Sequence, residues 1–250
     1  MVFVKKRVAR RFKTRVGFEN RRVLLFKIFD GLDSAFGPQY WWPVKGSYQG
    51  GPRNHHEAFE VMVGAILTQN TAWTNVEKAL ENLRSADCLT PETLRRMPTK
   101  RLAHLLRPSG YFNMKARRLK SFVSFLYQEY SGNTRRMLKE DPTILRQKLL
   151  SVKGIGPETA DSILLYAAGF PWFVVDAYTR RILSRHGLVA DTVSYDDLQD
   201  FFMKDLSGDT QLYNEYHALL VKLGKEICRR KPLCEQCPLL EVLGEPVLMA

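Results

Sequence analysis

The sequence predicts an all-α protein, and three observations carry this prediction. Apolar residues recur at helical spacing in two stretches, 56–68 and 117–127, which is typical of helices that bury one face. The alternation of apolar and polar positions that marks a half-buried strand is scarce. A glycine hairpin at 153–157 separates two further helical patterns. We therefore expect helices joined by turns, with a helix-hairpin-helix unit in the second half of the chain.

The two long apolar patterns define the first expected helices. The helix at 56–68 follows a linker at 46–54 that is rich in glycine and polar residues. Its apolar face consists of Phe59, Met62, Val63, Ile66 and Leu67. The helix at 117–127 has an equivalent face of Leu119, Phe122, Val123, Phe125 and Leu126. A chain of 250 residues is long enough to bury a sizeable core between such faces.

The hairpin reads Lys153-Gly154-Ile155-Gly156-Pro157. Its glycines allow a tight turn and leave backbone N–H groups uncovered, while proline is tolerated as a first helical residue. Uncovered N–H groups at the start of a helix suit a phosphate oxygen. An ordinary turn between helices would use the same residues, so the hairpin by itself leaves both interpretations open.

An acidic residue, Asp176, follows the second helix of this unit. The loop Gly169-Phe170-Pro171-Trp172 and the apolar Val174-Val175 precede it, and a helical pattern runs from 177 to 184. Aspartate is a favoured residue just before a helix, so a capping role explains it. A carboxylate beside a phosphate-binding hairpin could also be catalytic, and one side chain can do both.

Taken together, these residues resemble the endonuclease III superfamily of DNA glycosylases, whose signature is a helix-hairpin-helix followed by a Gly/Pro-rich loop and an aspartate. Two other segments match in order, at 67–71 and 110–116, as does a cysteine-bearing tail, and the resemblance covers about residues 38 to 240. It implies two helical lobes with the helix-hairpin-helix motif beside the cleft between them. We expect a central lobe at 55–170, a second lobe from 23–54 plus 171–250, and a basic arm at 1–22.

Charge supports a polyanionic partner. The chain carries a net charge of +12, which favours double-stranded DNA as the partner. Residues 1–22 hold nine basic residues and one acidic residue, so this arm supplies +8 of the total. It either binds phosphates or forms a solvated or disordered leader. No apolar signal core and no run of about 18 apolar residues is visible, so we expect a soluble, intracellular protein of the cytoplasm or nucleoid.

The resemblance assigns Asp176 to catalysis. Cleavage of an N-glycosidic bond builds positive charge on the deoxyribose, which a carboxylate can stabilise while it orients or deprotonates a water molecule. Bifunctional relatives carry a lysine two residues beyond the second hairpin glycine, where it forms a Schiff base. Glu158 stands at that position here. We therefore expect base removal without strand cleavage.

Further residues match the superfamily's DNA contacts. Gln69 corresponds to the residue that enters the base stack after the target has been flipped out; the alternative, a helix C-cap, explains the end of the helix but not the wider match. Asn113 and Lys115 resemble a second DNA-facing loop and are candidate phosphate contacts. The hairpin contributes Lys153, Gly154, Ile155 and Gly156.

Substrate choice depends on three tryptophans. Trp41 and Trp42, followed by Pro43, and Trp73 resemble the 3-methyladenine glycosylase branch. Alkylated purines carry positive charge and stack well on indoles, although each tryptophan could equally be a core residue. Lys225 falls where this branch has a lysine near the pocket, and a solvated surface lysine is the alternative. His217 has the character of a packed or capping histidine.

The cysteines depart from the superfamily's metal motif. Cys228, Cys234 and Cys237 match three of the four ligands of a 4Fe-4S cluster, but Leu243 stands at the fourth place. Such a cluster needs four ligands. The site could use Glu241 or Glu245 instead, hold a labile cluster, or be an empty remnant.

The sequence thus favours a monofunctional, monomeric base excision repair glycosylase for alkylated purines such as 3-methyladenine. The alternative within the superfamily is a mismatch glycosylase that removes thymine, uracil or adenine. The alternative from another class is a DNA-binding module without catalysis.

Overall fold

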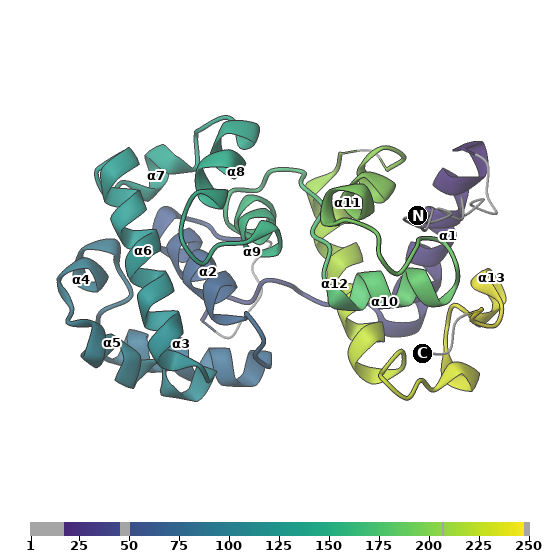
Figure 1. Cartoon of the computed structure of the whole chain (residues 1–250), viewed down its shortest axis with the longest axis horizontal. Helices are drawn as coiled ribbons and strands as arrows, with labels where there is room; N and C mark the ends of the chain where they lie inside the picture. The colour runs from purple at the N-terminus through teal and green to yellow at the C-terminus, as the bar shows by residue number, and fades with distance from the viewer. Residues whose placement is uncertain (1–17, 46–50, 207, 248–250) are drawn as a thin grey trace, which may run out of the picture. The chain divides into compact units, whose positions relative to one another are not determined.

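The computed structural model describes residues 18–45, 51–206 and 208–247, and the described residues contain helices and no β-strand (Figure 1). The all-α prediction is therefore confirmed. Most of the basic arm predicted at 1–22 lies outside the described residues. None of the described helices is long and apolar enough to cross a lipid bilayer.

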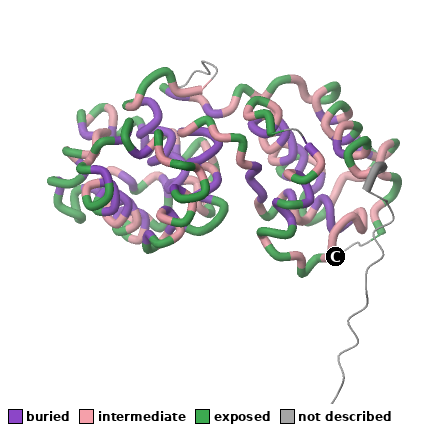
Figure 2. The backbone as a smooth tube through the Cα atoms, turned by 90° about the horizontal axis from the view of Figure 1, so that it is seen from above, coloured by how far each residue is buried: buried purple, intermediate pink, exposed green. Residues whose placement is uncertain are grey.

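The chain divides into two compact units. The central unit comprises residues 38–176 and 207–219, and the terminal unit comprises 1–37, 177–206 and 220–250. These boundaries fall at residues 37/38 and 176/177, whereas the sequence placed the lobe boundaries at 54/55 and 170/171. Within each unit, buried positions lie on the inner sides of the helices and exposed positions on the outside (Figure 2).

The elements follow one another along the chain as helices joined by short turns. The central unit contains α2 (His55–Leu67), α3 (Trp73–Ser85), α4 (Pro91–Arg96), α5 (Thr99–Leu105), η1 (Arg107–Ser109), α6 (Phe112–Tyr130), α7 (Thr134–Met137), α8 (Pro142–Leu150), α9 (Pro157–Ser162) and a π-helical turn, η2 (Ile163–Ala167). The terminal unit contains α1 (Phe18–Phe36), α10 (Ala177–Arg185), α11 (Tyr195–Met203), η3 (Cys234–Gln236) and α13 (Leu240–Leu243). Helix α12 (Thr210–Glu226) begins in the central unit and ends in the terminal unit.

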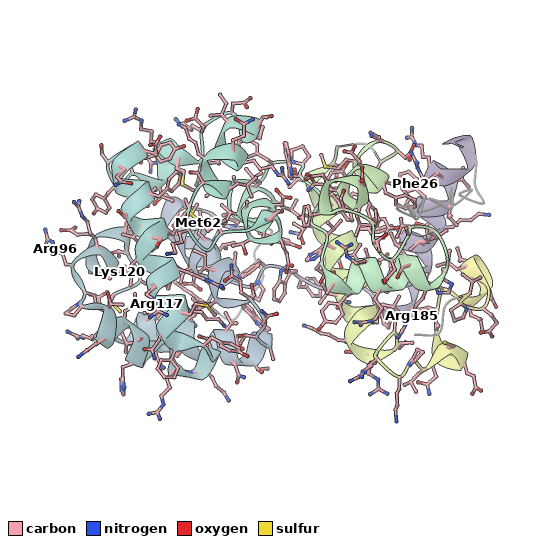
Figure 3. All side chains as sticks on the ribbon, viewed as in Figure 1. Phe26, Met62, Arg96, Arg117, Lys120 and Arg185 are labelled. Carbon is pink, nitrogen blue, oxygen red and sulfur yellow. The ribbon has the colours of Figure 1, made fainter. Side chains whose placement is uncertain are left out.

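Helix α2 forms the middle of the central core. Every residue from Glu57 to Leu67 is buried, and α2 packs against α3, α6, α7, α9 and the π-helical turn. Met62 lies in this interior, whereas Arg96 and Lys120 belong to the outer helices α4 and α6 (Figure 3). Both long apolar patterns of the sequence are thus confirmed as helices that face the core.

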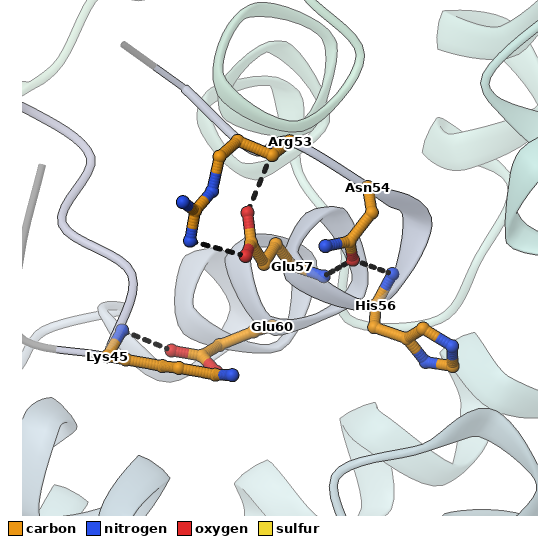
Figure 4. A network of polar contacts seen from close by, with 6 residues as sticks. All are labelled: Lys45, Arg53, Asn54, His56, Glu57 and Glu60. Atoms are coloured by element: carbon orange, nitrogen blue, oxygen red, sulfur yellow. Dashed lines mark hydrogen bonds and ion pairs between the residues drawn. The ribbon is translucent and has the colours of Figure 1, made fainter. Parts of the chain in front are cut away.

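Two buried glutamates tie α2 to the chain that precedes it (Figure 4). Glu57 accepts hydrogen bonds from the backbone N–H of Arg53, at 2.7 Å, and from its guanidinium, at 3.2 Å. These bonds, chiefly the one from the backbone, hold the pKa of Glu57 below its ordinary value. Glu60 accepts from the backbone N–H of Lys45 at 3.2 Å and from Arg84 at 2.7 Å. Lys45, which precedes the linker predicted at 46–54, and Arg53 within it are therefore fastened to the core.

The helix-hairpin-helix unit consists of α8, the turn at 151–156 and α9. Asp141 caps α8 by accepting from two backbone N–H groups. Gly154 adopts φ +95°, and a Cβ there would lie 2.5 Å from Cγ of Arg118, so only glycine fits this turn. Across the turn, Arg146 donates to both oxygens of Asp161, at 2.7 and 3.2 Å. Since Asp161 is fully buried, this two-pronged ion pair braces the hairpin from behind.

Candidate active site and DNA-binding hairpin

Asp176 lies at the end of a buried segment, Phe173–Val175. Phe173 packs edge-on against Tyr213 and Tyr216 of α12, with ring centroids 5.2 and 5.7 Å away. The side chain of Asp176 is 10% exposed. The segment thus anchors a carboxylate that is largely shielded from water.

A histidine and a tyrosine from distant parts of the chain lie behind this carboxylate. The hydroxyl of Tyr166, in the π-helical turn, is 2.5 Å from Nδ1 of His217 in α12. Nε2 of His217 is 3.9 Å from Oδ2 of Asp176. Burial, reinforced by the charges of Asp176 and Glu215, raises the pKa of Tyr166 well above its ordinary value. Tyr166 therefore keeps its proton, and its hydroxyl shares a hydrogen bond with Nδ1 of His217 in which either atom can be the donor.

The sequence did not single out this pair. Tyr166 and His217 are 51 residues apart, and a histidine in an amphipathic helix has no motif of its own. Tyr166 lies in a π-helical turn, a feature that often occurs at functional sites, but such a turn leaves no visible pattern in the sequence.

The three tryptophans predicted for the base pocket form one cluster. The ring centroids of Trp41 and Trp42 are 4.9 Å apart, and Trp73 lies 4.7 Å from Trp41 and 5.2 Å from Trp42. Trp42 also contacts Tyr166, at 5.4 Å. Trp42 is 4% exposed, whereas Trp41 and Trp73 are half-buried. The cluster is therefore linked through Tyr166 and His217 to Asp176.

Trp42 packs closely against α2 because residue 64 is a glycine. A Cβ at Gly64 would be 2.7 Å from Cζ2 of Trp42, closer than real contacts allow. The segment that carries the tryptophans is also held by the bond from Lys45 to Glu60. Sequence position and packing thus fix Trp42 as the buried member, and Trp41 as the more accessible one.

Gln69 connects the turn after α2 to the hairpin. Its amide nitrogen donates to the carbonyl of Gly154 at 3.1 Å and to the hydroxyl of Thr159 at 2.8 Å, and its oxygen accepts from Arg118. The side chain is half-buried. Gln69 therefore contacts the hairpin itself in the protein without DNA.

Lys115 does not lie on a DNA-facing surface, contrary to the expectation that it binds phosphate. It is 1% exposed, and its ammonium donates to the carbonyls of Leu67 and Ser109, at 2.7 and 2.6 Å, and to the hydroxyl of Thr71. Burial, and then the charge of Arg118, lowers the pKa of Lys115 to about 8. The amphipathic pattern could not reveal that this cation points inward to hold the turn at 67–71.

The other predicted DNA contacts lie at the surface. Asn113, in the first turn of α6, and Lys153, in the hairpin, are exposed. The N–H of Ile155 is used within the turn, where it donates to Val152 at 3.0 Å. The N–H groups of Gly154 and Gly156 make no hydrogen bond within the described part of the chain. Two backbone donors are thus available at the hairpin.

Glu158 lies one residue into α9, near Asp176. Water reaches its surface, yet the surrounding protein, reinforced by the negative charge of Asp176, raises the pKa of its carboxyl to about 7. Because Glu158 carries a carboxyl group and no amine, it cannot form a Schiff base with the sugar. Lys225, by contrast, lies in the last turn of α12, in the terminal unit, and its role at the pocket stays a prediction.

Comparison with known proteins identifies the family. The model of the HhH-GPD superfamily of base excision DNA repair proteins matches residues 63–207, which include the hairpin, Asp176 and the turn at 67–71. The chain belongs to this superfamily. A DNA repair glycosylase of Methanocaldococcus jannaschii is 45% identical over 225 residues, which cover 89% of this chain and 97% of the relative.

Two further HhH-GPD relatives extend this result. Endonuclease III of Thermotoga maritima is 31% identical over 189 residues, or 74% of this chain and 83% of that protein. The crystal structure of the 3-methyladenine DNA glycosylase of H. pylori bound to 1,N6-ethenoadenine superimposes with a TM-score of 0.67. It is 31% identical and covers 81% of this chain and 97% of that one. The protein is therefore a base excision repair DNA glycosylase, as the sequence predicted.

Proposed function

We propose that this HhH-GPD protein is a monofunctional glycosylase that removes alkylated purines, of which 3-methyladenine is the model, from double-stranded DNA. The observation that carries the proposal is the cluster of Trp41, Trp42 and Trp73, which Tyr166 links to Asp176. Indole faces attract a cationic, flat ring without the need for base-specific hydrogen bonds. The relative from H. pylori, whose name specifies 3-methyladenine, supports the same substrate class.

Asp176 is the catalytic residue of the proposal. When the bond between C1′ and the base breaks, the electron pair leaves with the base, and the positive charge of a 3-methylated adenine is thereby neutralised. The sugar becomes electron-poor, and the carboxylate stabilises it. The oxygen of a water molecule then bonds to C1′, while one water proton passes to the carboxylate and on to solvent. The products are the neutral free base and an intact strand with an abasic sugar.

His217 and Tyr166 act as positioning residues. Nε2 of the imidazole lies 3.9 Å from Oδ2 of the carboxylate, and the tyrosine hydroxyl shares a hydrogen bond with Nδ1 of the same ring. A neutral imidazole that donates from Nε2 would orient Asp176 without adding a positive charge that opposes the charge developing on the sugar. This arrangement is analogous to the orienting groups of other acid-base sites.

The DNA contacts of the proposal come from two turns of the central unit. The N–H groups of Gly154 and Gly156, with Lys153 beside them, suit a phosphate of the backbone. Gln69 would enter the stack in place of the flipped base, and it must first give up its bonds to Gly154 and Thr159. The enzyme is expected to work as a monomer.

Base release tests the proposal. Methylated duplex DNA should yield free 3-methyladenine, and strands should break only after treatment with alkali. Asp176→Asn should lower the single-turnover rate of base release by about 100- to 10,000-fold. The dissociation constant for a duplex with a stable abasic analogue should stay within a factor of about three of the wild-type value.

Two outcomes would contradict the proposal. Strand cleavage without alkali, or a protein–DNA adduct trapped by borohydride, would show that an amine acts as nucleophile. Release of thymine or uracil alone from mismatched duplexes would show that the tryptophans do not select the substrate. Unchanged activity of Asp176→Asn would remove the catalytic assignment.

A further inference from the structure

Arg118 links the turn that carries Gln69 to the hairpin. It lies near the start of α6 and is half-buried. Its guanidinium donates to the side-chain oxygen of Gln69. Its stem lies against Gly154, where a Cβ would be 2.5 Å from Cγ, 3.0 Å from Cδ and 3.1 Å from Nε of the arginine. The missing side chain at residue 154 thus lets this cation approach the backbone of the hairpin closely.

Both ends of the Gln69 amide are held in the free enzyme. The nitrogen donates to the carbonyl of Gly154 at 3.1 Å and to the hydroxyl of Thr159 at 2.8 Å, while Arg118 binds the oxygen. An amide that makes these three bonds cannot extend into the base stack of a duplex at the same time. The described arrangement is therefore a resting one, in which Gln69 is stored against the hairpin.

The guanidinium of Arg118 has donors to spare. An arginine side chain carries five N–H donors. Within the described residues Arg118 makes one hydrogen bond, to a neutral amide, and no carboxylate pairs with its charge. The phosphate that the proposed function places on the hairpin would lie beside this cation, because Gly154 belongs to both contacts. DNA thus brings the first full negative charge to Arg118.

A phosphate competes well with Gln69 for this guanidinium. Hydrogen bonds between a cation and an anionic oxygen are roughly twice as strong as bonds between neutral groups, and arginine can bind a phosphate through two parallel N–H groups. The oxygen of Gln69 is neutral and accepts from one nitrogen of Arg118. Once the arginine has turned to a phosphate, only the two bonds from the amide nitrogen hold Gln69 back.

We propose that Arg118 is a positioning residue that holds Gln69 against the hairpin in the free enzyme and turns to the hairpin phosphate when DNA binds, which releases Gln69 for the base stack. This exchange rests on the proposed function, in which Gln69 enters the stack. It adds a step that couples the capture of DNA to the insertion of Gln69. The enzyme thereby keeps Gln69 withdrawn until a duplex is in place.

A double-mutant cycle on DNA affinity tests the exchange, because the bond between Arg118 and Gln69 then exists only in the free enzyme. Arg118→Met keeps an unbranched stem beside Gly154 and removes the guanidinium. The dissociation constant for a duplex with a stable abasic analogue is measured for wild type, Arg118→Met, Gln69→Ala and the double variant. Affinity does not require base release, so the cycle is independent of catalysis.

The sign of the coupling separates the exchange from a supporting role. Arg118→Met should raise the dissociation constant by about three- to tenfold when Gln69 is present, since easier release of Gln69 offsets part of the lost phosphate contact. In the Gln69→Ala background this offset is gone, and the same substitution should raise the constant by about 30- to 100-fold. A residue that supported Gln69 in its inserted position would give the opposite order, because its removal would matter less once Gln69 is gone.

Salt dependence and a matched control complete the experiment. In Arg118→Met the slope of log affinity against log salt should fall by about 0.9, the value for one phosphate, and Arg118→Lys should keep the wild-type slope. Arg117, labelled on α6 in Figure 3, is exposed, and within the described chain no bond joins its side chain to Gln69. Arg117→Met should change affinity by the same factor with and without Gln69. Arg118→Gln repeats the cycle if Arg118→Met proves unstable in thermal unfolding.

Three results would overturn the exchange. Equal effects of Arg118→Met in the two backgrounds, or a smaller effect in Gln69→Ala, would show that no bond is given up on binding. An unchanged salt slope would show that Arg118 receives no phosphate. Each of these leaves the proposed glycosylase intact as long as wild type releases 3-methyladenine. If Gln69→Ala binds the abasic duplex as tightly as wild type does, Gln69 does not enter the stack, and its proposed role fails together with the exchange.

Discussion

The close approach of Trp42 to α2 allows a prediction with a calculable size. In Gly64→Ala the new Cβ would lie 2.7 Å from Cζ2 of Trp42 and 3.3 Å from Cε2. Ordinary carbon contacts are about 3.5–4.0 Å, so the indole must move by about 1 Å. Overpacking of this kind costs about 1–3 kcal/mol, of which the better helix propensity of alanine recovers about 0.5–1 kcal/mol. The net loss should be about 0.5–2 kcal/mol.

The displaced indole also disturbs the proposed base pocket. Trp42 contacts Trp41, Trp73 and Tyr166, so the shift reaches every ring of the cluster. A misplacement of about 1 Å can cost up to 100-fold in rate, and we expect single-turnover release of 3-methyladenine to fall by about 10- to 100-fold. The thermal midpoint should fall by about 1–8 °C, at about 2–4 °C per kcal/mol for a chain of this size.

Gly31→Ala is the matched control, because it is also a glycine in the interior of a helix. Its Cβ would lie 3.5 Å from Leu239, an ordinary contact, so stability should stay equal or rise and the rate should not change. Trp42→Phe in the Gly64→Ala protein should recover part of the lost stability, since the smaller ring leaves room. Wild-type rate and midpoint in Gly64→Ala would refute the argument that glycine at 64 positions the tryptophan.

Three further predictions concern charged groups of the central unit. Lys115→Met should lower the free energy of unfolding, measured in urea, by about 1–3 kcal/mol for each backbone carbonyl that loses its donor. The same substitution should leave the salt dependence of DNA affinity unchanged, since the buried ammonium neutralises no phosphate. The carboxyl of Glu158 has a folded-state pKa raised to about 7, so its ionisation opposes folding as pH rises from about 4.5 through 7. Glu158→Gln should therefore match the stability of wild type at low pH and exceed it above pH 7. A stability difference that is independent of pH would contradict this. Asp161→Asn leaves Arg146 without its buried charge partner, which should cost about 3–5 kcal/mol and weaken duplex binding by loosening the hairpin; unchanged binding in a gel-shift titration would show that the brace is unnecessary.

The fold could be predicted because its main signals are local. The apolar periods at 56–68 and 117–127 mark α2 and α6, although the bounds of α6, Phe112–Tyr130, extend beyond the pattern. The hairpin was equally visible, since a left-handed φ at Gly154 and a proline at the start of α9 both leave a mark in the sequence. These features depend on neighbouring residues alone.

The remainder of the site depends on contacts between distant residues. Nothing in the sequence pairs Tyr166 with His217, because the pairing arises when helices pack. Lys115 shows the opposite error, since a lysine in a DNA-facing motif was expected at the surface and its ammonium instead bonds to buried carbonyls. A motif identifies which residue types occur, while packing decides which way each of them points.

The short segment 207–219 belongs to the central unit although thirty residues of the terminal unit precede it. The segment carries His217, whose imidazole lies behind Asp176. That imidazole is absent until the segment has been synthesised and has docked onto a unit that was otherwise complete by residue 176. Contacts so distant in sequence form late because loop closure must come first. A nascent or proteolysed chain that ends before residue 207 would therefore hold the hairpin and the tryptophans without an oriented carboxylate. Such a fragment could occupy DNA, but it would remove bases poorly.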